Sequence, residues 1–157
     1  MVRYKSIKET KEQTKTPEFK KWFGRSKVVD KSGNPLVVYH GTQGNFTQFV
    51  SRRNIIYFSS VKKNSAMYAN SNNGSGKILE IFLSIQKPKI VYNIEDMRKA
   101  EKTAKKKGYD GIIAKGVKDG SHVSDVYIAF YPNQIKSATD NNGNFDPRSN
   151  NILEGIE

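Results

Sequence analysis

Residues 36–42 read Leu-Val-Val-Tyr-His-Gly-Thr, and this stretch decides how the rest of the chain is interpreted. Its first four residues are apolar, β-branched or aromatic, which predicts a buried strand. His40 then places a polar ring at the end of that strand. Gly41 follows it and has no side chain to keep a ligand away from the backbone. From this pattern alone, His40 is either a structural residue or part of a binding site.

On both sides of this stretch, short strand patterns outnumber helical ones. Thr16 and Pro17 provide capping and first-turn signals for a short helix that ends at Gly24. A turn at residues 30–35 joins two β-rich runs, which predicts a hairpin. Helical patterns cover residues 59–69 and 94–107, and the second of these has a strongly basic outer face. The predicted strands cover residues 26–29, 36–40, 46–50, 55–58, 77–85, 111–114, 126–130 and 135–136.

This order of elements lacks the regular strand–helix alternation of a doubly wound parallel sheet. The sequence contains no G-x-G-x-x-G motif and no P-loop, which further disfavours a Rossmann fold. We therefore predict an α+β fold with a largely antiparallel or mixed sheet and two or three short helices. We expect a flexible basic arm at residues 1–15, one domain at residues 16–148 and a tail at residues 149–157.

The composition excludes several kinds of chemistry. The chain has no cysteine, which rules out disulfides, cysteine-ligated metals and a thiol nucleophile. Its two histidines, His40 and His122, show no metal-ligand spacing, so we expect no metal. No apolar run approaches the roughly 18–20 residues of a membrane span, and residues 1–15 lack the apolar stretch of a signal peptide. We therefore expect a cytoplasmic protein that does not contact a membrane.

The net charge of +12 has two possible meanings. Much of it comes from the first thirty residues and from residues 98–107. A charge of this sign favours nucleic acid or an acidic protein as a partner. It also fits a lysine-rich, solvated surface with no binding role.

Several motifs in order resemble a known enzyme clan. Residues 38–42 resemble the first motif of diphtheria-toxin-like and poly(ADP-ribose)-polymerase-like ADP-ribosyltransferases, an apolar strand ending in His-Gly-Ser/Thr. Residues 56–59 (Ile-Tyr-Phe-Ser) and 65–69 (Ser-Ala-Met-Tyr-Ala) resemble the second motif, and residues 126–135 (VYIAFYPNQI) the third. The closest resemblance is to phage-type ART-PolyVal domains, which are similar at residues 22–30, 108–113 and 132–138.

The resemblance implies that NAD⁺ is the substrate, folded between two small sheets of a split β-sandwich. His40 would bond the adenosine ribose, and the backbone of Gly41 would hold the nicotinamide amide. Tyr57 and Tyr68 would stack on the two faces of the nicotinamide ring, which is planar and cationic. The residues implied in dinucleotide binding are His40, Gly41, Thr42, Tyr57, Phe58, Ser65 and Tyr68.

The catalytic residues implied by the resemblance are His40, Tyr57 and a carboxylate. Cleavage of the nicotinamide–ribose bond passes through an oxocarbenium-like state that a carboxylate stabilises. The glutamate of the family matches Val126 here, and Asp125 is the nearest carboxylate. In a regular strand Asp125 would face the other way, unless a bulge near Ser124 and Asp125 re-aims it. Glu80 and Gln134 are the other polar candidates.

These features lead us to expect mono-ADP-ribosylation rather than polymer formation. The acceptor would be a host protein or nucleic acid, modified by a monomeric, phage-derived enzyme that acts against host defence or gene expression. One alternative is an NAD⁺ glycohydrolase, which passes the ribosyl group to water. Another is an inactive member of the same fold that binds a target through its basic surface.

Overall fold

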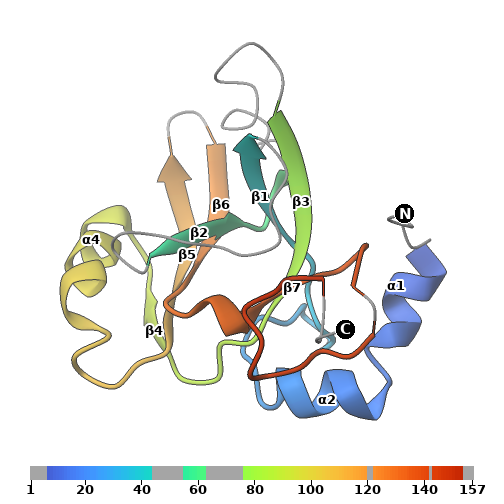
Figure 1. Cartoon of the computed structure of the whole chain (residues 1–157). Helices are drawn as coiled ribbons and strands as arrows, with labels where there is room; N and C mark the ends of the chain where they lie inside the picture. Colours follow the sequence, from blue (N-terminus) through green and yellow to red (C-terminus); the bar gives the residue numbers. More distant parts are fainter. Residues whose placement is uncertain (1–6, 44–54, 63–75, 120–121, 142, 154–157) are drawn as a thin grey trace.

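The computed structural model describes residues 7–43, 55–62, 76–119, 122–141 and 143–153 of the chain (Figure 1). Most of its elements are short strands, with helices at the two sides. The α-helices in these residues are α1 (Ile7–Gln13), α2 (Pro17–Phe23) and α4 (Ile94–Thr103). The strands are β1 (Val38–Gln43), β2 (Ile56–Ser59), β3 (Gly76–Leu83), β4 (Pro88–Val91), β5 (Gly111–Asp119), β6 (His122–Ala129) and β7 (Ile135–Ser137), with a 3₁₀ helix at Pro132–Gln134.

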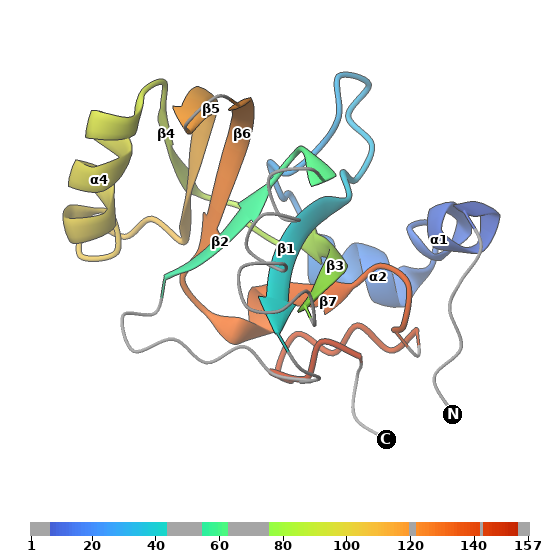
Figure 2. The same cartoon turned by 90° about the horizontal axis from the view of Figure 1, so that it is seen from above.

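The seven strands form one mixed sheet in the order β4-β5-β6-β2-β1-β3-β7. β4 and β5 pair in parallel, and all other neighbours pair antiparallel. Figure 2 shows that β2 crosses between two halves of this sheet, β4-β5-β6 on one side and β1-β3-β7 on the other. The structure thus confirms the predicted α+β fold with a mixed sheet and short helices, divided in the manner of a split β-sandwich.

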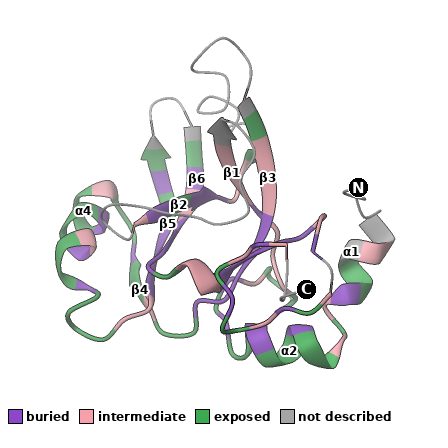
Figure 3. Cartoon of the chain, viewed as in Figure 1, coloured by how far each residue is buried: buried purple, intermediate pink, exposed green. Residues whose placement is uncertain are grey.

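The two faces of the sheet bury different apolar clusters. Neighbouring residues of β5 alternate between them: Ile113 belongs to a cluster with Phe58 and Tyr127, whereas Ile112 belongs to one that α4 covers. This alternation follows from the two-residue period of a strand. Buried residues are frequent on β2, β5, β6 and β7, and the outer face of α4 stays exposed (Figure 3).

Helix α2 forms as its capping signals predict. The Thr16 side chain accepts a hydrogen bond from the Phe19 backbone, and Pro17 occupies the first turn. Gly24 ends the helix with φ of +55°, a conformation that favours glycine. The aromatic face of the helix packs against Phe82 and Phe145, in a cluster formed by Phe19, Trp22, Phe23, Phe82, Ala138 and Phe145.

Helix α4 is shorter than predicted. Asn93 caps its start by accepting from the Asp96 backbone, and the helix ends at Thr103 rather than at residue 107. The turn that follows reaches Gly108, which has φ of +90°. Met97, Ala100 and Ala104 are buried against the sheet, so the side of α4 that carries them faces β5 and β6.

Some predicted elements begin or end elsewhere. The predicted hairpin around residues 30–35 is reduced to one bridge between Val29 and Pro35, and β1 starts at Val38. Strand β4 was not predicted, because Pro88 at its start is a residue that strand interiors exclude. The strand predicted at residues 46–50 and most of the helix predicted over 59–69 lie outside the described residues.

The described parts of the predicted arm and tail contact the rest of the fold. Within residues 1–15, α1 is helical, and Gln13 is buried and donates from its amide nitrogen to the Ala138 carbonyl at 2.6 Å. Within the predicted tail, Ser149 and Ile152 are buried, and Ile152 joins the core cluster of β1, β2 and β6. The described parts of both segments therefore belong to the fold, because they cover apolar surface that would otherwise be exposed.

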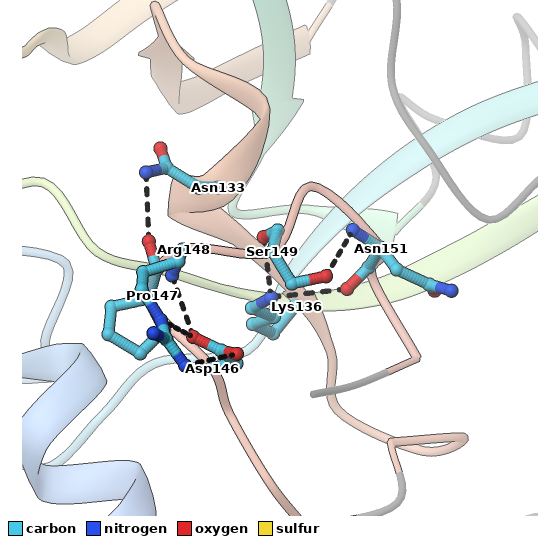
Figure 4. A network of polar contacts seen from close by, with 7 residues as sticks. All are labelled: Asn133, Lys136, Asp146, Pro147, Arg148, Ser149 and Asn151. Atoms are coloured by element: carbon cyan, nitrogen blue, oxygen red, sulfur yellow. Dashed lines mark hydrogen bonds and ion pairs between the residues drawn. The ribbon is translucent and has the colours of Figure 1, made fainter. Parts of the chain in front are cut away.

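A buried lysine forms hydrogen bonds with the backbone of residues 149–151 near the C-terminus (Figure 4). Lys136 of β7 is fully buried, and its Nζ donates to the Ser149 carbonyl at 2.9 Å and to the Asn151 carbonyl at 3.1 Å. A charged amine is costly to bury unless such acceptors surround it. The backbone also contributes, since the Ser137 N–H donates to the Ile152 carbonyl at 2.7 Å.

If residues 149–153 belong to the core, Ile152→Ala lowers the free energy of unfolding by about 2–4 kcal/mol, because it leaves a cavity. Urea unfolding measures this difference. Asn150→Ala is the matched control, since Asn150 is exposed in the same segment and its loss costs less than about 0.5 kcal/mol. Equal stability of the two variants would contradict the assignment of Ile152 to the core.

Candidate active site

The His40 ring contacts the backbone of β2. Its Nδ1 lies 2.7 Å from the Tyr57 carbonyl oxygen, and its ring centre lies 5.3 Å from that of Phe58. A carbonyl oxygen can only accept, so Nδ1 carries the proton. Burial lowers the pKa of His40, while the bond to the Tyr57 backbone opposes that shift. The ring is therefore neutral at pH 7, and Nε2 is its acceptor nitrogen.

Tyr57 points away from the core that its neighbours fill. Ile56 and Phe58 are buried, whereas Tyr57 is 40% exposed. Its hydroxyl donates to Oε1 of Glu101, and Nη1 of Arg98 lies 3.4 Å from the same hydroxyl. Burial of the phenol, followed by the Glu101 hydrogen bond and charge, raises the pKa of Tyr57 to about 12. The phenol thus keeps its proton, and its ring lies between β2 and α4.

The other residues predicted to bind a dinucleotide have different positions. Gly41 and Thr42 pair with Ile78 and Lys77 of β3, so the sheet fixes their backbone. The Phe58 ring is buried in the core, which assigns its side chain to packing rather than to contact with a ligand. Ser65 and Tyr68 lie outside the described residues.

Asp125 closes a bulge in the neighbouring strand. The register of β5 and β6 shifts between Ala114 and Val117, so Lys115 and Gly116 oppose Asp125. Gly116 has φ of +60°, and its N–H donates to Oδ1 of Asp125 at 2.8 Å. Lys115 Nζ lies 3.8 Å from Oδ2. A bulge is therefore present, but on β5, and its contacts give Asp125 a structural role rather than aiming it at Tyr57.

The strand position that matches the family's glutamate is apolar in structure as well as in sequence. Val126 pairs with Ser59 of β2 and packs with the cluster under α4. Because Tyr57 and Ser59 alternate with Phe58, Val126 lies on the same face of the sheet as Tyr57. Asp125, one residue earlier, lies on the opposite face. Among the described residues, β6 thus brings no carboxylate to the Tyr57 side.

Gln134 has no catalytic geometry. Its Oε1 accepts from the backbone N–H of Phe130 and of Tyr131, and its Nε2 donates to the carbonyls of Ser84 and Asp110. The side chain is buried, so these bonds serve to hold the end of β6 against the segment after β3. All four hydrogen bonds of the Gln134 side chain given above thus go to the backbone.

Glu80 also lies in a different environment from Tyr57. It pairs with Tyr39 across β1 and β3, and its carboxylate lies 4.0 Å from Lys62 Nζ. Its charge contributes, after burial, to a raised pKa of Tyr39. Its carboxylate thus belongs to a partly exposed ion pair with Lys62.

Sequence reasoning missed Glu101, the carboxylate that Tyr57 does contact. The only signal was its place on α4, where Arg98 and Glu101 are three residues apart and can pair on one helix face. Nothing in the linear sequence indicates which strand this helix face meets.

Comparison with models of known protein families shows which family the chain belongs to. The family model described as ADP-ribosyltransferase in polyvalent proteins matches residues 30–103 and 89–145, which together span most of the 157 residues. The chain belongs to this family. A search of curated proteins finds no match.

Membership of this ADP-ribosyltransferase family confirms the resemblance seen in the motifs and agrees with the divided mixed sheet. The matched stretch includes His40, Tyr57 and Glu101 as well as Asp125 and Val126. Among the described residues, no group of three or more histidines and carboxylates is placed to hold a metal ion. No helix in the same residues is long and apolar enough to cross a membrane.

The lowered pKa of His40 makes stability depend on pH. As the pH falls below about 6.5, the histidine of the unfolded chain takes up a proton, whereas the folded ring takes it up only at lower pH. The unfolded state is therefore favoured, and the free energy of unfolding decreases. His40→Asn keeps a donor near the position of Nδ1 but does not titrate. Urea unfolding at pH 7.5, 6.5 and 5.5 (about one pH unit apart) should show a steeper loss for the parent chain than for this variant. Parallel losses would contradict a partly buried His40 that stays neutral as the pH falls below 6.5.

Proposed function

We propose that this chain is a mono-ADP-ribosyltransferase that takes ADP-ribose from NAD⁺ and attaches it to a macromolecule of a host cell. ADP-ribosyltransferase domains in general use NAD⁺ as substrate, and the chain belongs to such a family. The observation that carries the proposal is the 2.7 Å bond between the His40 ring and the Tyr57 carbonyl. It joins the two motif residues and leaves the imidazole in the tautomer that accepts a ribose hydroxyl.

In the proposed reaction, His40 and Tyr57 bind and orient NAD⁺. NAD⁺ supplies the ADP-ribosyl group when its nicotinamide–ribose bond breaks. His40 orients the adenosine ribose through Nε2, and the Tyr57 ring offers a partly exposed aromatic face to the cationic nicotinamide. Nicotinamide leaves with the bonding electrons, the acceptor's nucleophile bonds to the ribose carbon, and the acceptor loses its proton.

The missing glutamate restricts this activity. In the family, a strand carboxylate bonds the ribose and takes the proton of the acceptor, and Val126 cannot do either. We therefore propose single transfer rather than polymer formation. The same observation favours one second candidate, hydrolysis of NAD⁺, because water is a nucleophile that needs no docking site.

The biological setting follows from the family alone. Polyvalent proteins give this domain its name, and the phage-type relatives that the motifs resemble suggest an origin in a phage. We propose that the modified molecule is a component of host defence or gene expression in the host cytoplasm. The protein would act as a monomer.

The binding role of Tyr57 and His40 predicts that either residue, changed to alanine, weakens NAD⁺ binding by roughly 5- to 30-fold, since the cation–π contact of Tyr57 or the hydrogen bond of His40 is worth about 1–2 kcal/mol. Calorimetric titration with NAD⁺ measures the affinity, and nicotinamide release measures the chemistry. Tyr92→Ala is the matched control, because Tyr92 is a tyrosine 71% exposed at the start of α4. Undiminished binding by Tyr57→Ala would overturn the site.

We propose that the acceptor docks on the outer face of α4 and the turn after it. Its exposed lysines continue from Arg98, which contacts the Tyr57 hydroxyl, toward Lys105, whose ammonium lies 4.7 Å from the Tyr131 ring centre. A surface of this charge attracts acidic macromolecules over distances of about a Debye length. The exposed lysines of this surface are Lys99 and Lys102 on α4 and Lys105, Lys106 and Lys107 in the turn after it.

Charge reversal by Lys102→Glu with Lys106→Glu should reduce ADP-ribosylation of host lysate by about tenfold at low salt, with the difference shrinking as salt rises. NAD⁺ binding should remain, because neither lysine contacts Tyr57 or His40 in the described structure. Lys27→Glu with Lys31→Glu makes the same change in net charge in the segment between α2 and β1, and this segment lies away from α4 (Figure 2). Equal transfer by both double variants would remove α4 as the docking face. Prior nuclease or protease treatment of the lysate identifies the class of acceptor.

A further inference from the structure

Glu101 occupies an unusual place on α4 for a charged residue. The core-facing stripe of this helix consists of Met97, Ala100 and Ala104, spaced as a packed helix face requires. Glu101 follows Ala100 directly and lies at the edge of that stripe, with a side chain only 11% exposed. Charged side chains are rarely so covered unless they have a specific partner.

The partners of Glu101 come from two directions. Arg98 Nη1 lies 3.3 Å from Oε1 and 3.4 Å from Oε2, within the same helix. The Tyr57 hydroxyl donates to Oε1 from β2, which is 44 residues earlier in the chain. The arginine side chain is 59% exposed, so the pair alone would contribute little to stability. The contact with Tyr57 is therefore the more informative one.

We propose that Glu101 is a positioning residue for Tyr57, which holds the phenol ring in the orientation that receives the nicotinamide of NAD⁺. This inference rests on the proposed function and names a residue that the motifs of the family do not include. The carboxylate restricts rotation of the tyrosine side chain, so less freedom is lost when the ring stacks on a ligand. Arg98 in turn holds the carboxylate.

The charge of Glu101 adds a second effect in the same direction. A phenol that donates to a carboxylate has a more electron-rich ring, and such a ring attracts a cation more strongly. Oxidised nicotinamide is cationic before its bond to ribose breaks. The arrangement thus favours binding of NAD⁺ over binding of released, neutral nicotinamide.

Affinity for NAD⁺ tests this role. Glu101→Ala and Tyr57→Phe, which both remove the hydrogen bond but keep the aromatic ring, should each weaken NAD⁺ binding about tenfold. The double variant should bind as weakly as either single variant, because both changes remove the same interaction. Glu101→Gln keeps an oxygen acceptor and should recover most of the affinity. Glu95→Ala is the control, since it removes an exposed carboxylate from the first turn of the same helix.

The outcomes separate the two claims. If the parent chain does not bind NAD⁺, the proposed function fails. If the parent chain binds NAD⁺ and Glu101→Ala binds it equally well, the positioning role fails while the function stands. Additive losses in the double variant also overturn the positioning role. Circular dichroism on each variant shows whether it is folded. If Glu101→Ala unfolds, Tyr57→Phe keeps the test decisive, because it removes the same hydrogen bond and its undiminished NAD⁺ binding would overturn the positioning role.

Discussion

The four residues of β2, Ile56–Ser59, join the two halves of the sheet, because β2 pairs with β6 along one edge and with β1 along the other. Their alternation then fixes what each side chain can do. Ile56 and Phe58 are drawn into the core shared by both halves, and this packing leaves Tyr57 directed toward α4. A shift of one residue in β2 would bury Tyr57 and expose Phe58.

The same strand also sets the chemistry of His40. Its imidazole bonds to a β2 carbonyl, so the tautomer of the ring depends on a backbone atom that the sheet already positions. Tyr57 in turn depends on α4, because its hydroxyl meets Glu101 there. The candidate site is therefore assembled from β1, β2 and α4, and its carboxylate comes from a helix rather than from β6.

The elements with local signals were predictable from sequence. Thr16 and Pro17 specify the start of α2, and the β-rich run at residues 55–58 predicts β2. The family motifs predict His40 and Tyr57 as residues of the binding site. Both motifs lie on regular strands, β1 and β2. The core that β2 organises could be anticipated only in outline, because apolar residues indicate burial without naming their partners.

Features that depend on distant contacts were not predictable. The bulge lies at Lys115 and Gly116, and only the pairing of β5 with β6 shows that Asp125 closes it. The polar segment containing Ile152 suggests a tail, yet a single apolar side chain and the buried Lys136 bring it back to the core. Glu101 was missed for the same reason, since helix periodicity gives its face but not the strand opposite.

We propose that His40 and Tyr57 receive NAD⁺ between β1, β2 and α4. A crystal structure of the chain with a non-hydrolysable NAD⁺ analogue tests this binding mode directly. We expect the nicotinamide ring stacked on Tyr57, with the Tyr57 hydroxyl still on Glu101, and an adenosine ribose hydroxyl bonded to Nε2 of His40. An analogue bound elsewhere, with Tyr57 and His40 making only the contacts described above, would contradict it.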